Sequence, residues 1–286
     1  MNNLLSNGKD RFKSGLSLAS NSFSLLWQHP ILLVYLAVSI GLYLVIQTIS
    51  YNTASYDLSF TTGITNVGPL FDLSRWHHYL LLLIFTFGYV YVSTLLTVCL
   101  ISHVNHFLRY EHVSILDNIY PVRKKLRITF YWSLIITALA YLIQLLSSHV
   151  ATPQQFFNPY MIFISLLGIT WSFLTFIVVP IITLEKVTIG QALIKSKDIV
   201  FSLFIEIIAG VFWIALIAIL VSMPFVIPLV LKMNVQIPGL LILVSTCCIM
   251  LIALVISTVQ AIFKTILYNY YTKPIEELEK LKYPRF

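Results

Sequence analysis

The chain has 286 residues, of which 58% are hydrophobic and only 10% are charged, and its formal net charge is +7. Soluble domains carry about 25% charged residues, so this composition excludes an ordinary soluble protein and a separate soluble domain. The basic excess does not indicate nucleic-acid binding, because the basic residues are divided among short segments between long apolar runs.

Six of these apolar runs are long enough to cross a bilayer. A helix needs about 20 apolar residues to span the ~30 Å hydrocarbon core, where every backbone polar group must be paired within the segment. The sequence therefore predicts an all-α polytopic membrane protein with six transmembrane helices, forming a single integral membrane domain over residues 1–286. The predicted spans are residues 31–49, 79–101, 128–146, 160–184, 201–223 and 240–263.

The basic residues lie almost entirely on one side of these spans. The N-terminus, the segments 102–127 and 185–200, and the tail from Lys264 contain three, five, three and five Lys and Arg, which is sixteen of the eighteen. Lys and Arg in short loops stay on the cytoplasmic face, so both termini are predicted to be cytoplasmic. The excess positive charge is expected to contact anionic lipid headgroups, and no nucleic-acid partner is expected.

The residues before the first span predict an amphipathic helix in the membrane interface. Its apolar side chains recur at spacings of four, three, four and four, which places them on one helix face. They are Phe12, Leu16, Ala19, Phe23 and Trp27. Such a helix lies along the bilayer surface, with Trp27 at headgroup depth.

Two further cytoplasmic segments predict interfacial helices of the same kind. One starts after a cap at Ser114 and precedes Pro121; the other starts after a cap at Thr188 and turns into the fifth span near Val200. The chain thus reads as three units, each an interfacial helix followed by a transmembrane hairpin. The candidate contacts for lipid headgroups, all just after Pro121, are Arg123, Lys124, Lys125 and Arg127.

Glu206 is the sharpest candidate for a polar site within a span. A carboxylate at the centre of a span costs roughly 2.5–3.5 kcal/mol, and less near the end, so some interaction should offset the cost. Two interpretations stay open. Glu206 is either a proton or cation site facing the helix bundle, or a shallow residue that reaches the interface or pairs with Lys264 at the same end of the last span.

Other polar features within the spans have simpler interpretations. Pro180 frees the carbonyl of Phe176 and predicts a kink, which either lines a cavity or is purely structural. Gln260, like Gln47 and Gln144, is expected to hydrogen-bond across helices. The tyrosines from Tyr268 to Tyr271 predict an aromatic belt at the interface.

No constellation of catalytic residues emerges. His103 and His106 share a helix face, as two metal ligands would, and lie near Glu111 and His112, but polar interface residues are the better interpretation. The sequence contains no H-E-x-x-H, G-x-S-x-G or P-loop motif. We therefore expect no enzyme, no metal site and no cofactor.

Three stretches resemble a family of uncharacterised bacterial six-span membrane proteins. They are the residues up to WQHPILLVYL before the first span, Phe176–Lys197 with its VVPIITLEKVTIGQALIKSK, and Val259–Tyr271 with its VQAIFKTILYNYY. Family members are distantly similar to the membrane domain attached to some glycerophosphodiester phosphodiesterases. The resemblance implies an integral protein of the bacterial inner membrane and transfers no catalytic residue.

The sequence favours a non-enzymatic, membrane-organising or accessory role. Its expected partners are anionic lipids on the cytoplasmic side and either another membrane protein or a second copy of the chain. The alternative is a small-solute or lipid transporter, with Glu206 and the kink at Pro180 lining the path. A hydrolase would require the histidines to meet Glu111 or Glu206 around one pocket.

Overall fold

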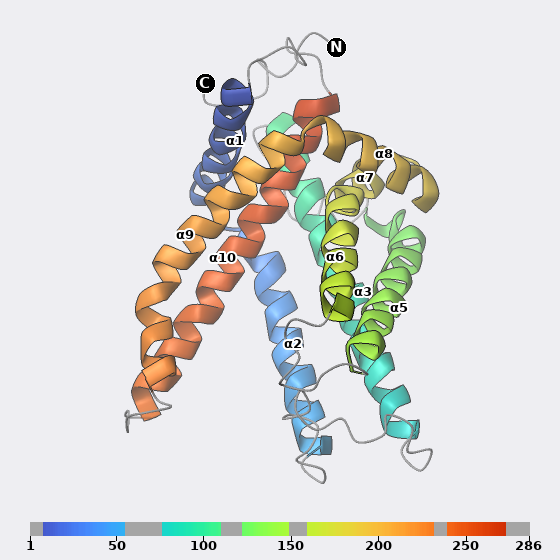
Figure 1. The fold of residues 1–286 in the computed structure, drawn as a ribbon, viewed down its shortest axis with the longest axis vertical. Coiled ribbons are helices and arrows are strands. Elements are labelled where there is room, and N and C mark those ends of the chain that lie inside the picture. The colour runs from blue at the N-terminus through green and yellow to red at the C-terminus, as the bar shows by residue number, and fades with distance from the viewer. Residues whose placement is uncertain (1–7, 55–75, 110–121, 149–158, 232–238, 273–286) are drawn as a thin grey trace.

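The computed structural model describes residues 8–54, 76–109, 122–148, 159–231 and 239–272 (Figure 1). Within these ranges the chain forms helices and no strand, so the prediction of an all-α fold is confirmed. In chain order the helices are α1 (Gly8–Gln28), α2 (Leu32–Ala54), α3 (Trp76–Arg109), α5 (Leu126–Ser148), α6 (Pro159–Leu174), α7 (Val178–Leu184), α8 (Ile189–Ser202), α9 (Phe204–Leu231) and α10 (Gly239–Thr272).

The long helices have the length and apolarity of membrane spans. Five stretches meet both criteria, and a sixth is obtained if α1 and the start of α2, which meet at 89°, count as one bent span. The five are Leu83–Leu108, Leu126–Ile143, Ile162–Leu184, Phe204–Ile227 and Val244–Thr272. The polytopic architecture is therefore confirmed, with five to six spans, and each predicted span overlaps one of the helices.

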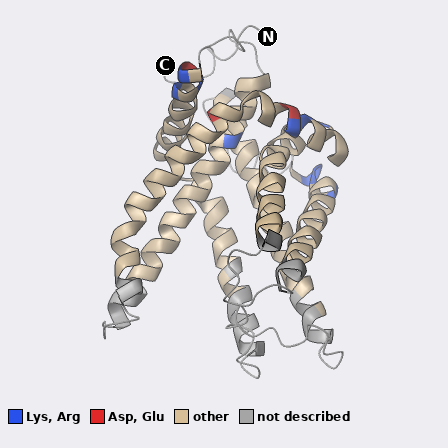
Figure 2. Cartoon of the chain, in the orientation of Figure 1, with Lys and Arg blue, Asp and Glu red and all other residues tan. Residues whose placement is uncertain are grey.

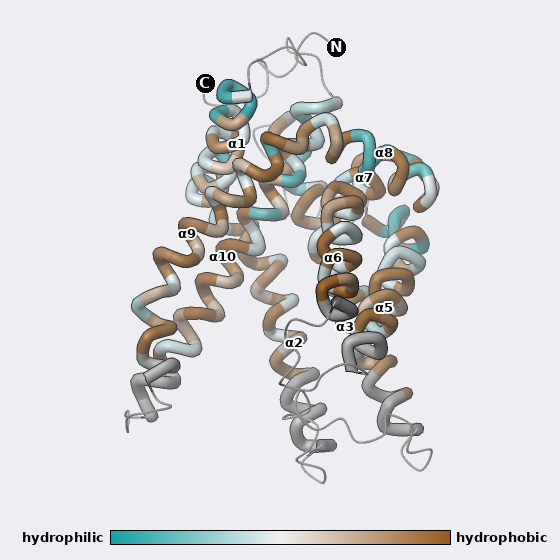
Figure 3. The backbone as a smooth tube through the Cα atoms, viewed as in Figure 1, coloured by the Kyte–Doolittle hydropathy of each residue, from teal (hydrophilic) through white to brown (hydrophobic). Residues whose placement is uncertain are grey.

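The spans are arranged as antiparallel neighbours (Figure 1). Helices α9 and α10 pair along their length, α2 pairs with α3, and α5 packs on the other side of α3. Helix α1 packs on α9 and α10 at the end of the bundle where α10 finishes, and α8 lies beside α6 and α7 near the same end. Figure 3 shows hydrophobic residues along the spans and hydrophilic ones gathered at this end.

Helix α1 forms where predicted, but its most buried face is not the predicted one. Phe12 and Trp27 are 41% and 80% exposed, whereas Ala19 is fully buried. The buried residues of α1 are Gly15, Leu18, Ala19, Ser22, Leu25 and Leu26. This stripe of small and apolar residues packs on α9 and α10, so α1 is a docked part of the bundle and not a helix held by lipid alone.

The fourth predicted span is broken, as Pro180 predicts. Helix α6 ends at Leu174 and α7 begins at Val178. Pro180 has no N–H to donate to the Phe176 carbonyl, so a regular helix cannot continue through this turn. The Ser196 hydroxyl of α8 donates to the Leu174 carbonyl over 2.6 Å, which satisfies a backbone group at the end of α6.

The third predicted interfacial helix is confirmed as α8. Thr188 accepts a hydrogen bond from the Gln191 backbone N–H, and the Gln191 side chain accepts one from the Thr188 N–H, forming a capping box. Ile194 and Phe201 of α8 are 62% and 69% exposed. The second predicted interfacial helix, after Ser114, lies outside the described residues.

Candidate functional site

The charged residues of the described part of the chain gather at one end of the bundle (Figure 2). The start of α1, the start of α5, helix α8 and the last turns of α10 all lie toward this end. A bilayer imposes this separation, because an ionised side chain is costly within the hydrocarbon core. The end is called the charged end below.

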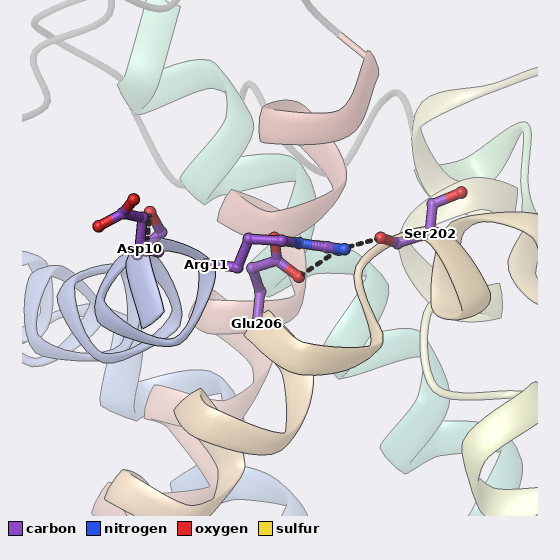
Figure 4. Close-up of polar contacts among 5 residues, drawn as sticks. Asp10, Arg11, Ser202 and Glu206 are labelled. Atoms are coloured by element: carbon purple, nitrogen blue, oxygen red, sulfur yellow. Dashed lines mark hydrogen bonds and ion pairs between the residues drawn. The ribbon is translucent and has the colours of Figure 1, made fainter. Parts of the chain in front are cut away.

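Glu206 is held by a bidentate ion pair with Arg11 (Figure 4). Arg11 Nε donates to Glu206 Oε1 over 2.7 Å, and Arg11 Nη2 donates to Oε2 over 2.8 Å. The two side chains are 17% and 5% exposed. Paired N–H groups of a guanidinium match the two carboxylate oxygens, so both charges are compensated where water is scarce.

The ion pair sits at the junction of α8 and α9. Glu206 lies in the first turn of α9, where the helix dipole favours a negative charge. Arg11 Nη2 also donates to the carbonyl of Ser202, the last residue of α8. Arg11 therefore connects α1 to both neighbouring helices at once. The interpretation in which Glu206 pairs with Lys264 is wrong, because its carboxylate is bonded to Arg11.

Close backbone contact between α1 and α9 makes this pairing feasible. A Cβ atom on Gly15 would lie 2.4 Å from the Glu206 carbonyl oxygen and 2.9 Å from Ala209 Cβ. On the other side of α9, a Cβ on Gly210 would lie 2.2 Å from the Phe263 ring of α10. Small residues allow such close packing of helices in membranes. Helix α9 is thus clamped between α1 and α10.

A second polar cluster surrounds Glu185, which sequence reasoning missed. The Lys195 ammonium and the Tyr268 hydroxyl both bond to Glu185 Oε1, and Lys125 donates to the Glu185 backbone carbonyl. The cluster joins α5, α8 and α10 just beyond the end of α7. Burial lowers the pKa of Lys125 and so does nearby Lys186, while Glu185 acts to raise it.

The predicted aromatic belt is therefore only partly correct. Tyr268 is 5% exposed and Asn269 is 2% exposed, because both face the bundle. Tyr271 is 41% exposed. The pattern of tyrosines predicts an interface, but the bond from Tyr268 to Glu185 makes this side chain part of the protein interior.

The four candidate headgroup contacts divide into two groups. Arg123, Lys124 and Arg127 are exposed, whereas Lys125 is partly buried by its contact with Glu185. The Arg127 guanidinium lies 6.0 Å from the centroid of the Tyr131 ring. Three of the four side chains are thus exposed at the charged end.

The histidines do not form a metal site in the described part of the chain. His103 is 5% exposed, and its Nδ1 lies 3.2 Å from the Tyr35 hydroxyl of α2. Within the described ranges no three His, Cys, Asp or Glu residues are close enough to share a metal ion. His103 is a helix-packing residue between α2 and α3, not an interface residue; Glu111 and His112 lie outside the described residues.

Lys264 and the helix break before Pro180 are brought together by Phe176. The Lys264 ammonium lies 4.6 Å from the centroid of the Phe176 ring, a cation–π contact. The same ring lies 6.5 Å from that of Phe263. Of the three predicted intramembrane site residues, Lys264 contacts Phe176, four residues before Pro180, whereas Glu206 is paired with Arg11.

No family model, no curated protein and no solved structure matches the chain. The fold and the polar contacts define its class on their own: an all-α, multi-pass membrane protein whose charged end is fastened by buried polar contacts. The resemblance to the membrane domain of glycerophosphodiester phosphodiesterases stays a prediction.

Proposed function

We propose that the protein is a non-enzymatic, multi-pass protein of the bacterial inner membrane that organises the membrane or assists other membrane proteins. It acts through contacts with anionic lipids and with a protein partner or a second copy of itself. The observation that carries this proposal is the charged end, where exposed basic side chains lie beside the docked amphipathic helices α1 and α8.

The exposed residues at this end suit a membrane surface. Arg123 and Arg127 can contact phosphates, while Ile194 and Phe201 of α8 present exposed apolar side chains. A basic residue near an anionic surface contributes about 1 kcal/mol of attraction. Apolar side chains on an interfacial helix add to this by burial at the acyl boundary.

Replacing both Arg123 and Arg127 by glutamine should weaken the binding of phosphatidylglycerol about thirtyfold, because two headgroup contacts of about 1 kcal/mol each are lost. Native mass spectrometry of the purified chain, titrated with phosphatidylglycerol and with phosphatidylcholine, measures this. The matched control replaces exposed Lys9 and Lys13 of α1 by glutamine, which removes the same charge elsewhere. Equal losses in the two double variants would reduce the effect to net charge and contradict specific contacts near α5.

A reporter enzyme that is active only outside the cytoplasm should be silent when it is fused after Phe286. The expectation follows from the positive-inside rule, because the charged end includes both the start of α1 and the end of α10. The same reporter fused after Pro153, in the predicted outer loop, is the positive control. Activity after Phe286 would reverse the proposed orientation.

The environment of Glu206 does not support the transport hypothesis, in which Glu206 would line the path. Both oxygens of Glu206 are bonded to Arg11, and the residue is only 3% exposed, so it has the environment of a structural carboxylate. At the break before Pro180, the Leu174 carbonyl at the end of α6 accepts a hydrogen bond from the Ser196 hydroxyl, so this backbone group also has a partner within the protein. The geometry therefore favours the accessory role.

A further inference from the structure

Lys264 is a basic residue within a span whose charge is not compensated by a carboxylate in the described part of the chain. Its ammonium contacts the Phe176 ring, and no carboxylate of the described residues forms an ion pair with it. The four carboxylates that the structure describes are Asp10, Glu185, Asp198 and Glu206. Glu185 and Glu206 have other basic partners, Lys195 and Arg11. A cation–π contact leaves ammonium N–H groups available for an anion.

Two uncharged polar residues precede Lys264 on the same face of α10. Ser257, Gln260 and Lys264 are separated by three and four residues, which places them on one side of a helix. Ser257 and Gln260 are exposed, although Thr258, Val259, Ala261 and Ile262 beside them are buried. Among the described residues the Gln260 amide makes no hydrogen bond to another helix.

This polar face contrasts with the rest of α10. The hydroxyls of Thr258 and Thr265 each donate to the carbonyl four residues earlier over 2.8 Å, so both are satisfied by their own helix. Ser257 makes no such bond within the described chain. A glutamine amide and a serine hydroxyl facing hydrocarbon would each lose hydrogen bonds to water. A ligand with acceptor oxygens would restore them.

The depths of Lys264, Gln260 and Ser257 in the bilayer match those of the phosphate and the glycerol esters of a phospholipid. The apolar run of α10 predicted to span the bilayer, residues 240–263, ends immediately before Lys264, which places Lys264 at the inner edge of the hydrocarbon core. Gln260 and Ser257 lie about 6 Å and 10 Å deeper. A phosphate at Lys264 would thus place its glycerol esters near Gln260 and its acyl chains along α10.

Between Lys264 and the end of α10, the same helix face is covered by the contacts of Tyr268. Tyr268 lies one turn closer to the end of α10 on the same face, is 5% exposed, and is bonded to Glu185, which also binds Lys195. The exposed side chains of this face, Ser257 and Gln260, are on the opposite, membrane side of Lys264. An amphiphile in the bilayer would therefore approach Lys264 along the exposed side of Ser257 and Gln260, whereas the Glu185 cluster lies on the other side of Lys264.

We propose that the face of α10 formed by Ser257, Gln260 and Lys264 binds one anionic glycerophospholipid, with its phosphate on the Lys264 ammonium and its ester carbonyls on Gln260 and Ser257. This site rests on the proposed function and deepens it, because it names a stoichiometric lipid in addition to the surface contacts of Arg123 and Arg127. Charge complementarity and depth together select a lipid as the occupant.

Titration of the purified full chain with phosphatidylglycerol, followed by native mass spectrometry, tests the site. Lys264→Met should weaken binding of the first lipid at least fivefold, and Gln260→Leu about twofold to threefold. Lys264→Arg, which keeps the charge, should stay within twofold of the natural chain. Lys197→Met, at an exposed lysine of α8, is the matched control and should leave the first lipid unchanged. First-lipid binding by Lys264→Met equal to that of Lys197→Met would overturn the proposal.

A second measurement uses the unmodified protein, so it does not depend on how the variants fold. Phosphatidylglycerol bearing a photoreactive group near its glycerol should label residues 253–264. Labelling confined to other segments, efficient competition by glycerol phosphate without acyl chains, or a second protein chain covering this face would each contradict a lipid site. If the double Arg123 and Arg127 variant bound phosphatidylglycerol as the natural chain does, the surface contacts of the proposed function would be contradicted. The result for Lys264→Met would still decide whether the site on α10 binds a lipid.

Discussion

Arg11→Met should lower the free energy of unfolding by about 3 kcal/mol, because it leaves the buried Glu206 carboxylate without its partner. Breaking a buried ion pair from one side typically costs 3–5 kcal/mol, and the 17% exposure of Arg11 favours the lower end. The Ser202 carbonyl loses a donor at the same time. Unfolding of the detergent-solubilised chain by denaturant, monitored by circular dichroism, measures the change.

Two further variants separate the ion pair from other effects of the substitution. Lys13→Met changes an exposed lysine of the same helix and should alter stability by no more than about 0.5 kcal/mol. The double variant Arg11→Met with Glu206→Met should recover most of the loss, since apolar replacement of a buried pair is often neutral. If Arg11→Met were no more destabilising than Lys13→Met, the pair would contribute no stability to the contact between α1 and α9.

The spans and the cap of α8 were predictable because both depend on local sequence. A bilayer of fixed thickness sets the length of each apolar run, and the Thr188 cap needs only Gln191 three residues later. The break before Pro180 was predictable for the same reason, since a missing N–H acts on the carbonyl four residues earlier. None of these features depends on which helices become neighbours.

The partners of the buried charges depend on neighbours that are distant in sequence. Glu206 and Arg11 are 195 residues apart, and Tyr268 and Glu185 are 83 apart. The sequence indicates that Glu206 needs a basic partner. Both Lys264 and Arg11 qualify, because both are predicted to lie at the cytoplasmic ends of the spans, as Glu206 does. Arg11 is the partner because α1 docks against α9, and no local pattern in α1 specifies which helix it docks against.

The docked face of α1 does not follow from hydrophobic periodicity, because that periodicity depends on large apolar side chains. Hydrophobic periodicity identifies Phe12 and Trp27, which are exposed and suit contact with lipid. The helix contact instead runs through Gly15, Ala19 and Ser22, which are small and buried. Lipid is as apolar as leucine, so helices in a membrane associate through close packing, and small residues mark that face. The spacing of Gly15 and Ala19 was the available signal.

Gly15→Ala should lower the free energy of unfolding by about 1–3 kcal/mol, the usual cost of overpacking a close contact. The new Cβ would lie 2.4 Å from the Glu206 carbonyl oxygen, and a backbone atom within α9 cannot rotate away. Helix α1 would have to move off α9. The same unfolding experiment measures the change, and loss of α1 docking should also increase cleavage by added protease near Gly8.

Gly190→Ala in α8 is the matched control, because a Cβ there meets nothing within 4 Å. Alanine is favoured over glycine in a helix by about 1 kcal/mol, so this control should stabilise the chain where Gly15→Ala destabilises it. The opposite signs exclude helix propensity as the cause. Stabilisation by both substitutions would contradict the close contact between α1 and α9.

The two α1 variants should not be additive, because they act on one contact. Moving α1 away from α9 to accommodate a Cβ on Gly15 also stretches the 2.7 Å and 2.8 Å bonds from Arg11 to Glu206. Once those bonds are broken, Arg11→Met has less left to remove, so the double variant should lose clearly less than the sum of the single losses. Simple additivity would mean that the ion pair forms regardless of how closely the helices approach. Coupling would mean that Gly15 sets the distance at which Arg11 can reach a carboxylate 195 residues away.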